Sequence, residues 1–177
     1  SKEWLLSWQK SETAAQKAIA AWTAENFSEP TVARVLTSSL AVGEQLVISS
    51  SMPIRDVEWF GSVTSGVTVH SNRGANGIDG VVSTAVGVAL GSGSPTSLLI
   101  GDVALLHDVN GLLALNRRTL DMSIVVTNND GGSIFSFLPQ ACFTSSLPLI
   151  NSNDFCPFTM RSGLLKRSAC FSNWKGF

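Results

Sequence analysis

The stretch "LLIGDVALLHDVNGLLALNRRTLDMSIVVTNNDGGSIF", residues 98–135, predicts the fold most directly. It holds two apolar runs that end in small polar clusters, "GD" at 101–102 and "NNDGG" at 128–132, with a helix-like segment between them. This order of strand, helix and strand is typical of a right-handed crossover between two parallel strands. Because parallel strands end at one edge of a sheet, we expect Asp102 and Asn129 to face the same ligand.

The rest of the chain extends this pattern to four strands that alternate with helices. The apolar runs are nearly continuous, which is typical of parallel strands covered on both faces. We therefore predict an α/β fold, an open and mainly parallel sheet with helices on both faces. The strands are expected within 44–51, 67–72, 96–102 and 122–130. Helices are expected at 3–24, 81–93 and 104–118, and one or two helical turns at 53–61. A further helix is expected to begin after Ser28, which is its predicted N-cap.

The composition excludes several classes of protein. The chain has 177 residues, is 44% hydrophobic and only 14% charged, and carries a net charge of −1. It has no basic cluster dense enough for a nucleic-acid partner, and no apolar run approaches the ~20 residues of a membrane span. Its three cysteines, at 142, 156 and 170, form no CxxC pair, which argues against a disulfide framework or a zinc site. The start resembles neither a signal nor a transit peptide, and the absence of an initial Met suggests a processed product or a fragment.

The polar clusters at the strand ends suggest a metal–diphosphate site. A carboxylate at Asp102 and an amide oxygen at Asn129 are hard oxygen ligands suited to Mg²⁺ or Ca²⁺. The glycines after Asn129 let the backbone approach closely, so a carbonyl there is a third candidate ligand. The alternative is a structural one, since a Gly-Asp pair at a strand end often forms only a turn or a helix cap.

Several other residues invite a functional interpretation that we consider weaker. His70 and His107 have no Ser or Cys partner at a recognisable spacing and are predicted to be non-catalytic. Asp108 and Asn110 are predicted to be packing or capping groups. The tryptophans of the first helix are predicted to form a core or interface stripe.

Four segments in the same order resemble one enzyme family. The "GD…NN" pattern is similar to the motif that binds thiamine diphosphate (ThDP). The flanking segments resemble 2-succinyl-5-enolpyruvyl-6-hydroxy-3-cyclohexene-1-carboxylate (SEPHCHC) synthase, an enzyme of menaquinone and phylloquinone biosynthesis. These segments are "SSSMPIRD" at 49–56, "SNRGANGIDG" at 71–80, "LHDVNGL" at 106–112 and "NNDGGSIFSFLPQ" at 128–140. The resemblance covers about residues 1–140.

The resemblance implies roles for individual residues. Asp102, Asn129 and the carbonyl of Gly131 would hold Mg²⁺ (or Mn²⁺), and Ser51 would contact the diphosphate. Arg55 and Arg73 would bind substrate carboxylates, although Arg55 could instead be a surface partner of Asp56 or Glu58. Cofactor-contacting apolar positions would be Ile78, which could also be plain core, and Ile134, Phe135 and Leu138.

The family's reaction is a decarboxylation of 2-oxoglutarate followed by addition of the resulting carbanion to isochorismate. The glutamate that activates the cofactor lies in a separate pyrimidine-binding domain, so no catalytic residue is assigned to this chain. In the family that domain and a homo-oligomer complete the site. The alternative function is a non-catalytic truncated remnant or interaction module, with little or no activity alone.

The resemblance also suggests how the chain is organised. Residues 1–27 would be a leading helix or linker from a preceding domain, and 28–140 the diphosphate-binding α/β domain. Residues 141–177 depart from the family pattern and would form a divergent, poorly ordered tail, which leaves the sheet incomplete at its C-terminal end. This change favours a plant source, and the expected location is then the chloroplast; otherwise it is the cytoplasm.

Overall fold

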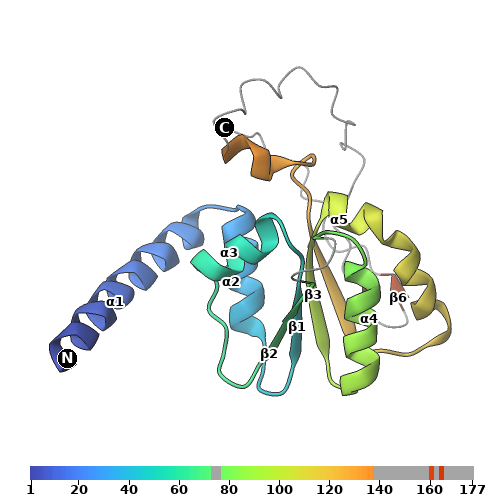
Figure 1. Cartoon of the computed structure of the whole chain (residues 1–177), viewed down its shortest axis with the longest axis horizontal. Coiled ribbons are helices and arrows are strands. Elements are labelled where there is room, and N and C mark those ends of the chain that lie inside the picture. The colour runs from blue at the N-terminus through green and yellow to red at the C-terminus, as the bar shows by residue number, and fades with distance from the viewer. Residues whose placement is uncertain (73–76, 138–159, 162–163, 166–177) are drawn as a thin grey trace.

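Four parallel strands form the centre of the fold. The computed structural model describes residues 1–72, 77–137, 160–161 and 164–165. Within them the sheet has the order β2-β1-β3-β4, and all three pairings are parallel (Figure 1). The strands are β1 (Gln45–Ile48), β2 (Thr68–Ser71), β3 (Thr96–Gly101) and β4 (Met122–Thr127); two further two-residue strands, β5 (Met160–Arg161) and β6 (Leu164–Leu165), pair antiparallel. The predicted α/β class with a parallel sheet is confirmed.

Helices connect the strands as the sequence pattern predicts. Helix α2 begins after Ser28, whose side chain accepts a hydrogen bond from the Thr31 amide, so the predicted N-cap is confirmed. The helices are α1 (Lys2–Glu25), α2 (Glu29–Ser39), α3 (Met52–Phe60), α4 (Val81–Ser92) and α5 (Asp102–His107), followed by the 3₁₀-helices η1 (Val109–Arg117) and η2 (Ser133–Phe137).

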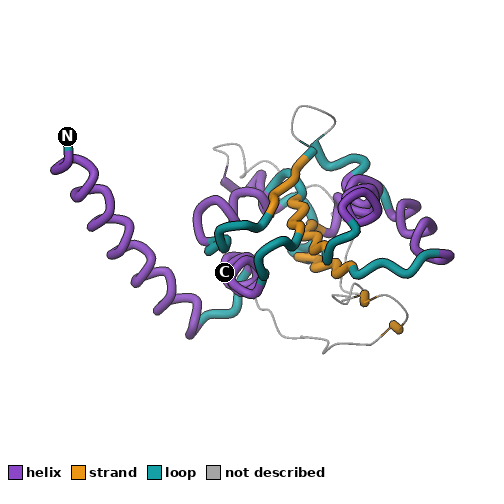
Figure 2. The backbone as a smooth tube through the Cα atoms, turned by 90° about the horizontal axis from the view of Figure 1, so that it is seen from below, coloured by secondary structure: helices purple, strands orange, loops and turns teal. Residues whose placement is uncertain are grey.

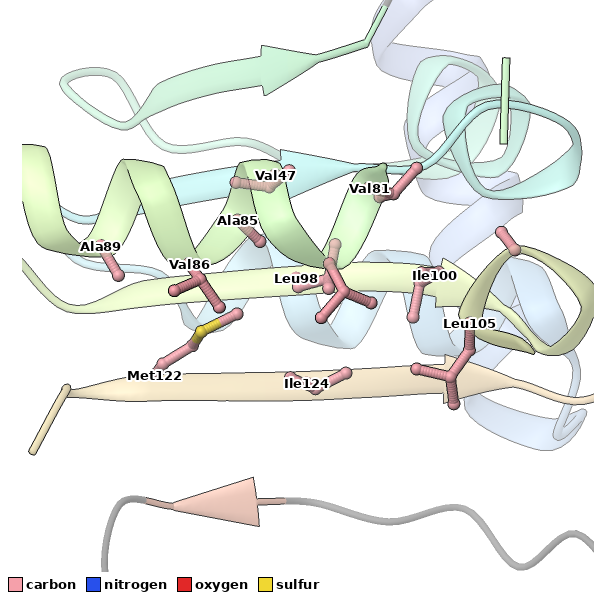
Figure 3. Packing of buried hydrophobic residues seen from close by; sticks show 12 residues of the cluster. Val47, Val81, Ala85, Val86, Ala89, Leu98, Ile100, Leu105, Met122 and Ile124 are labelled. Atoms are coloured by element: carbon pink, nitrogen blue, oxygen red, sulfur yellow. The ribbon is translucent and has the colours of Figure 1, made fainter. Parts of the chain in front are cut away.

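Alternating side chains of the strands bury both faces of the sheet. On one face, Leu46 and Ile48 of β1 pack with Leu40 and with partly buried residues of α2 and α3. On the other, Val47, Leu98 and Ile100 pack against α4 and α5 (Figure 3). Figure 1 shows α2 and α3 on one side of the sheet and α4 on the other. Helices therefore cover both faces, which explains why the apolar runs of the strands are continuous.

Helix α1 contributes no buried residue to this core. It extends away from the sheet in both views (Figures 1 and 2), and Trp4 and Trp8 are each 62% exposed. A hydrogen bond of 2.8 Å from Arg34 to Gln16 joins it to α2. The interpretation of these tryptophans as core is therefore wrong, and their role in an interface stays a prediction.

The helix expected at 104–118 is interrupted at Asp108. Its carboxylate accepts hydrogen bonds from the amide and the hydroxyl of Ser83, at 2.6 and 2.9 Å. The N-cap residue of α4 is Gly80, which has no side chain, so Asp108 caps α4 from another element. Asp108 leaves helical geometry, with φ −133° and ψ 29°, and the chain continues as the 3₁₀-helix η1. The capping role predicted for Asp108 is confirmed, whereas the single continuous helix is wrong.

Close packing places η1 against the start of α4. A Cβ atom on Gly111 would lie 2.8 Å from the Ser83 hydroxyl oxygen, so only glycine fits at this position. None of the helices that the structure describes is long and apolar enough to cross a membrane.

Candidate functional site

The sheet topology brings three strand ends to one edge. From β1 the chain passes through α3 to β2, and it then crosses β1 through α4 to reach β3. Neighbouring strands β1 and β3 therefore lead to helices on opposite faces, and ligands of open α/β sheets bind at such a point. The segments that follow β1, β3 and β4 meet at this carboxyl edge, where the sequence predicted the site.

The segment after β1 contains a strained residue. Ser51 has φ 75° and ψ −133°, a backbone conformation that non-glycine residues rarely adopt. Its carbonyl oxygen accepts a hydrogen bond of 2.7 Å from Nη1 of Arg55 one helical turn later. Arg55 thus contacts the backbone of Ser51. Ser51 and Arg55, two of the predicted site residues, are held together here.

Asp102 follows β3 directly and is only 7% exposed. Its Oδ1 accepts a hydrogen bond of 2.9 Å from the Val103 amide, and the Gly131 amide also donates to the carboxylate. Gly131 has φ +80°, and a Cβ atom there would lie 3.2 Å from Val103 Cγ2 and 3.9 Å from Asp102 Oδ2. The loop after β4 therefore closes tightly over the Asp102 carboxylate, and a glycine is needed for that approach.

Asn129 lies in the same loop and is oriented by a distant residue. The register pairs Gly101 with Thr127, so Asp102 and the loop of Asn129 leave adjacent strand ends. Nδ2 of Asn129 donates a hydrogen bond of 2.8 Å to Oε1 of Glu29, the first residue of α2. The structure thus brings together Asp102, Gly131 and Asn129, and adds Glu29 to them.

Glu29 and Asp56 are two acidic residues that the sequence interpretation missed. Asp56 is 2% exposed, and its Oδ2, like Oε2 of Glu29, has no hydrogen-bond partner among the residues that the structure describes. Their positions in the topology offered a signal. Helix α2 runs into the start of β1 and α3 leaves its end, so the first turns of both helices lie at the carboxyl edge.

Three carboxyl groups that are wholly or partly buried lie at this edge. Burial raises the pKa of Glu29, the hydrogen bond from Asn129 opposes this shift, and repulsion by Asp102 adds to it. Burial and repulsion by Glu29 raise the pKa of Asp56 to about 7. Burial also raises the pKa of Asp102, although the amides of Val103 and Gly131 counteract the effect. A cation bound at this edge would favour the ionised form of these carboxyls.

The chemistry of the oxygen donors fits Mg²⁺ better than a softer metal. Asp102, Asn129 and a backbone carbonyl supply hard oxygens. Among the described residues, no group of three or more His, Cys, Asp or Glu side chains is placed to hold a metal ion. A metal here would draw on amide and carbonyl oxygens, as the predicted ligand set does.

The remaining predicted residues are placed in part. Ile78 is partly buried against the core cluster of α4, Ile134 is partly buried in η2, and Phe135 is 55% exposed. Arg73, Leu138 and nearly all of the predicted tail 141–177 lie outside the described residues. The assignments of these residues to cofactor and substrate stay predictions.

The two histidines lie on β2 and α5. Nε2 of His70 is 2.9 Å from Oε1 of Gln45, the first residue of β1, which points it toward the opposite end of that strand. His107 is exposed in the last turn of α5. Their lack of a catalytic role stays a prediction.

Comparison with known proteins supports the resemblance. No protein-family model matches the chain. A protein of Chloroflexus aurantiacus, a 2-succinyl-5-enolpyruvyl-6-hydroxy-3-cyclohexene-1-carboxylate synthase, is 45% identical over 161 residues, which are 87% of this chain and 27% of the relative. Synthases of the same name are 50% identical over 116 residues in Myxococcus xanthus (65% of this chain, 20% of the relative) and 48% identical over 141 residues in Rubrobacter xylanophilus (78% and 24%). The chain spans about a quarter of the length of these relatives. The resemblance inferred from sequence is thus confirmed as a partial match: the chain is related to one part of the SEPHCHC synthases.

Proposed function

We propose that this chain forms the diphosphate- and metal-binding part of a ThDP-dependent SEPHCHC synthase of menaquinone biosynthesis. One observation carries the proposal: the buried Asp102 carboxylate lies under the Asn129–Gly131 loop at the ends of adjacent strands. The sequence similarity to the SEPHCHC synthases points to the same function.

In this proposal different residues of the carboxyl edge bind the metal ion, the diphosphate and the rings of ThDP. Asp102, the amide oxygen of Asn129 and the Gly131 carbonyl hold Mg²⁺, which in turn binds diphosphate oxygens. Ser51 contacts the diphosphate. Its positive φ is a strained backbone conformation of the kind that clusters at functional sites, which supports this role. Ile78, Ile134, Phe135 and Leu138 contact the apolar rings of the cofactor.

Substrate binding is assigned to two arginines. The whole enzyme would act on 2-oxoglutarate and isochorismate, both dicarboxylates, and a guanidinium binds a carboxylate through two parallel hydrogen bonds. Arg55 is held beside Ser51 by its hydrogen bond to the Ser51 carbonyl, which places its guanidinium at the carboxyl edge. Arg73 is the second candidate. When bound, ThDP supplies the electron sink for decarboxylation and carbon–carbon bond formation.

Catalysis would require parts that this chain does not supply. The activating glutamate belongs to a pyrimidine-binding domain in the family, so the isolated chain is expected to bind the cofactor without turnover. The partners are therefore that domain, in a homo-oligomer, and the small-molecule substrates.

Isothermal titration of the chain with ThDP in the presence of Mg²⁺ tests the proposal. Asp102→Ala and Asn129→Ala should each weaken binding about tenfold or more, because each removes a metal ligand. Asp121→Ala is the matched control, since this exposed acid lies before β4, at the opposite edge of the sheet. No binding by the wild-type chain, or unchanged binding by both site variants, would contradict the proposal.

A second candidate function is a non-catalytic interaction module. The exposed tryptophans of α1 favour it, because a helix with no buried residue offers its apolar side chains to a partner. Co-purification with a pyrimidine-domain protein, together with no binding of ThDP and Mg²⁺, would support this alternative.

A further inference from the structure

A contact at the carboxyl edge that has no assigned role joins Glu29 and Asn129. They lie 100 residues apart in the chain, and their side chains form a hydrogen bond of 2.8 Å. Glu29 is only partly exposed, and Ser28 fixes the start of its helix through the cap on α2. The partner of Asn129 is therefore held by a helix and not by a mobile loop.

The chemistry of the pair orients the carboxamide of Asn129. An ionised carboxylate only accepts hydrogen bonds, whereas a carboxamide has one donating and one accepting end. In the structure the NH₂ group of Asn129 faces Glu29, and a flipped amide would set its oxygen against the carboxylate. The amide oxygen is then left on the other branch of the side chain, where it is available to a metal ion.

We propose that Glu29 is a positioning residue that orients the Asn129 carboxamide so that its oxygen is presented to the metal. This inference rests on the proposed function, because it takes Asn129 as a metal ligand. Partners of this kind commonly fix the orientation of metal ligands and raise their affinity for the metal. Glu29 does so from the first turn of α2, which lies far from the other ligands along the chain but at the same carboxyl edge of the sheet.

The pair can be tested by exchanging its two functional groups. Glu29→Gln removes the orienting charge and provides a group that can donate as well as accept, so Asn129 can adopt either flip. Asn129→Asp keeps a ligand oxygen but sets two carboxylates against each other. In the double variant the glutamine amide donates to the new carboxylate, and the orientation is restored with the roles reversed.

The experiment measures the binding of Mn²⁺ to the 177-residue chain in the presence of ThDP. Bound Mn²⁺ is detected by its effect on water-proton relaxation. Glu29→Gln and Asn129→Asp should each weaken Mn²⁺ binding about tenfold or more. The double variant should recover most of that loss. Urea denaturation of each variant separates this effect from a merely structural role, which would lower stability without the selective recovery of metal affinity.

Glu44→Gln is the matched control, because this partly buried glutamate also accepts a hydrogen bond, from the Ala41 amide, at the opposite edge of the sheet. Unchanged Mn²⁺ affinity in Glu29→Gln, or no recovery in the double variant, would overturn the role of Glu29. If Asp102→Ala also bound Mn²⁺ like wild type, the proposed function itself would fail, so the two failures are distinguishable.

Discussion

Replacing Asp56 by asparagine is expected to remove most of the pH dependence of the free energy of unfolding of this chain. Asp56 is 2% exposed in α3, and its Oδ2 has no hydrogen-bond partner in the described part of the chain. Burial and the charge of Glu29 raise its pKa from 3.8 to about 7. The folded protein therefore binds this proton more tightly than the unfolded chain does.

The sign and size of the effect follow from proton linkage. Stability from this group is fully present below about pH 4, where both states are protonated, and it is lost as the pH rises toward 7. The rise of the Asp56 pKa from 3.8 to about 7 corresponds to a loss on the order of 4 kcal/mol. Asparagine cannot ionise, so the variant should lack this decrease. Its unpaired amide adds a cost of about 1–3 kcal/mol that does not change with pH.

The free energy of unfolding is measured by urea denaturation at several pH values from about 5 to about 8. Circular dichroism monitors unfolding, and EDTA in the buffer removes divalent cations. The free energy of unfolding of the wild-type chain should fall across this range, and that of Asp56→Asn should fall much less. Glu58→Gln is the matched control, since Glu58 is exposed on the same helix.

Parallel pH profiles for the wild-type chain and Asp56→Asn would refute the reasoning. So would a wild-type stability that rises from pH 5 to pH 8, because the sign would then be wrong. A residual slope in the variant is expected from Glu29, whose pKa is also raised by burial.

Three further substitutions test local features. Asp108→Ala should lower the free energy of unfolding by about 2 kcal/mol, because Ser83 loses both hydrogen bonds that cap α4; urea denaturation checks this, and an unchanged midpoint would contradict the capping role. Ser51→Gly should raise stability by about 1 kcal/mol by relieving a φ of 75°, yet weaken ThDP binding in a calorimetric titration. Gly131→Ala should destabilise the chain by about 1–2 kcal/mol, since φ is +80° and the new Cβ would crowd Val103 Cγ2 at 3.2 Å; a thermal melt equal to wild type would contradict this.

The pattern of raised pKa values links stability to ligand binding. Glu29, Asp56 and Asp102 come from three different helices, and burial raises the pKa of each. A divalent cation at the carboxyl edge would favour their ionised forms, so Mg²⁺ with ThDP is expected to stabilise the folded chain most at neutral pH.

Much of the site was predictable because it follows local rules. Asp102 and Asn129 each end an apolar strand, and parallel strands must end at the same edge, so their proximity needs only the strand order. The N-cap at Ser28 and the capping role of Asp108 also followed from residue type. The break of the helix at 108 did not, because it depends on the pairing of Asp108 with Ser83 on another element.

The sequence by itself determined the alternation of strands and helices, the parallel sheet and the polar edge, since these depend on periodicity and on short-range turn chemistry. Only the tertiary structure decided that Glu29 meets Asn129, that Asp56 is buried in α3, and that α1 lies outside the core. Such contacts join residues far apart in the chain, and their energies depend on burial and on neighbouring charge. Neither quantity exists until the helices have packed against the sheet.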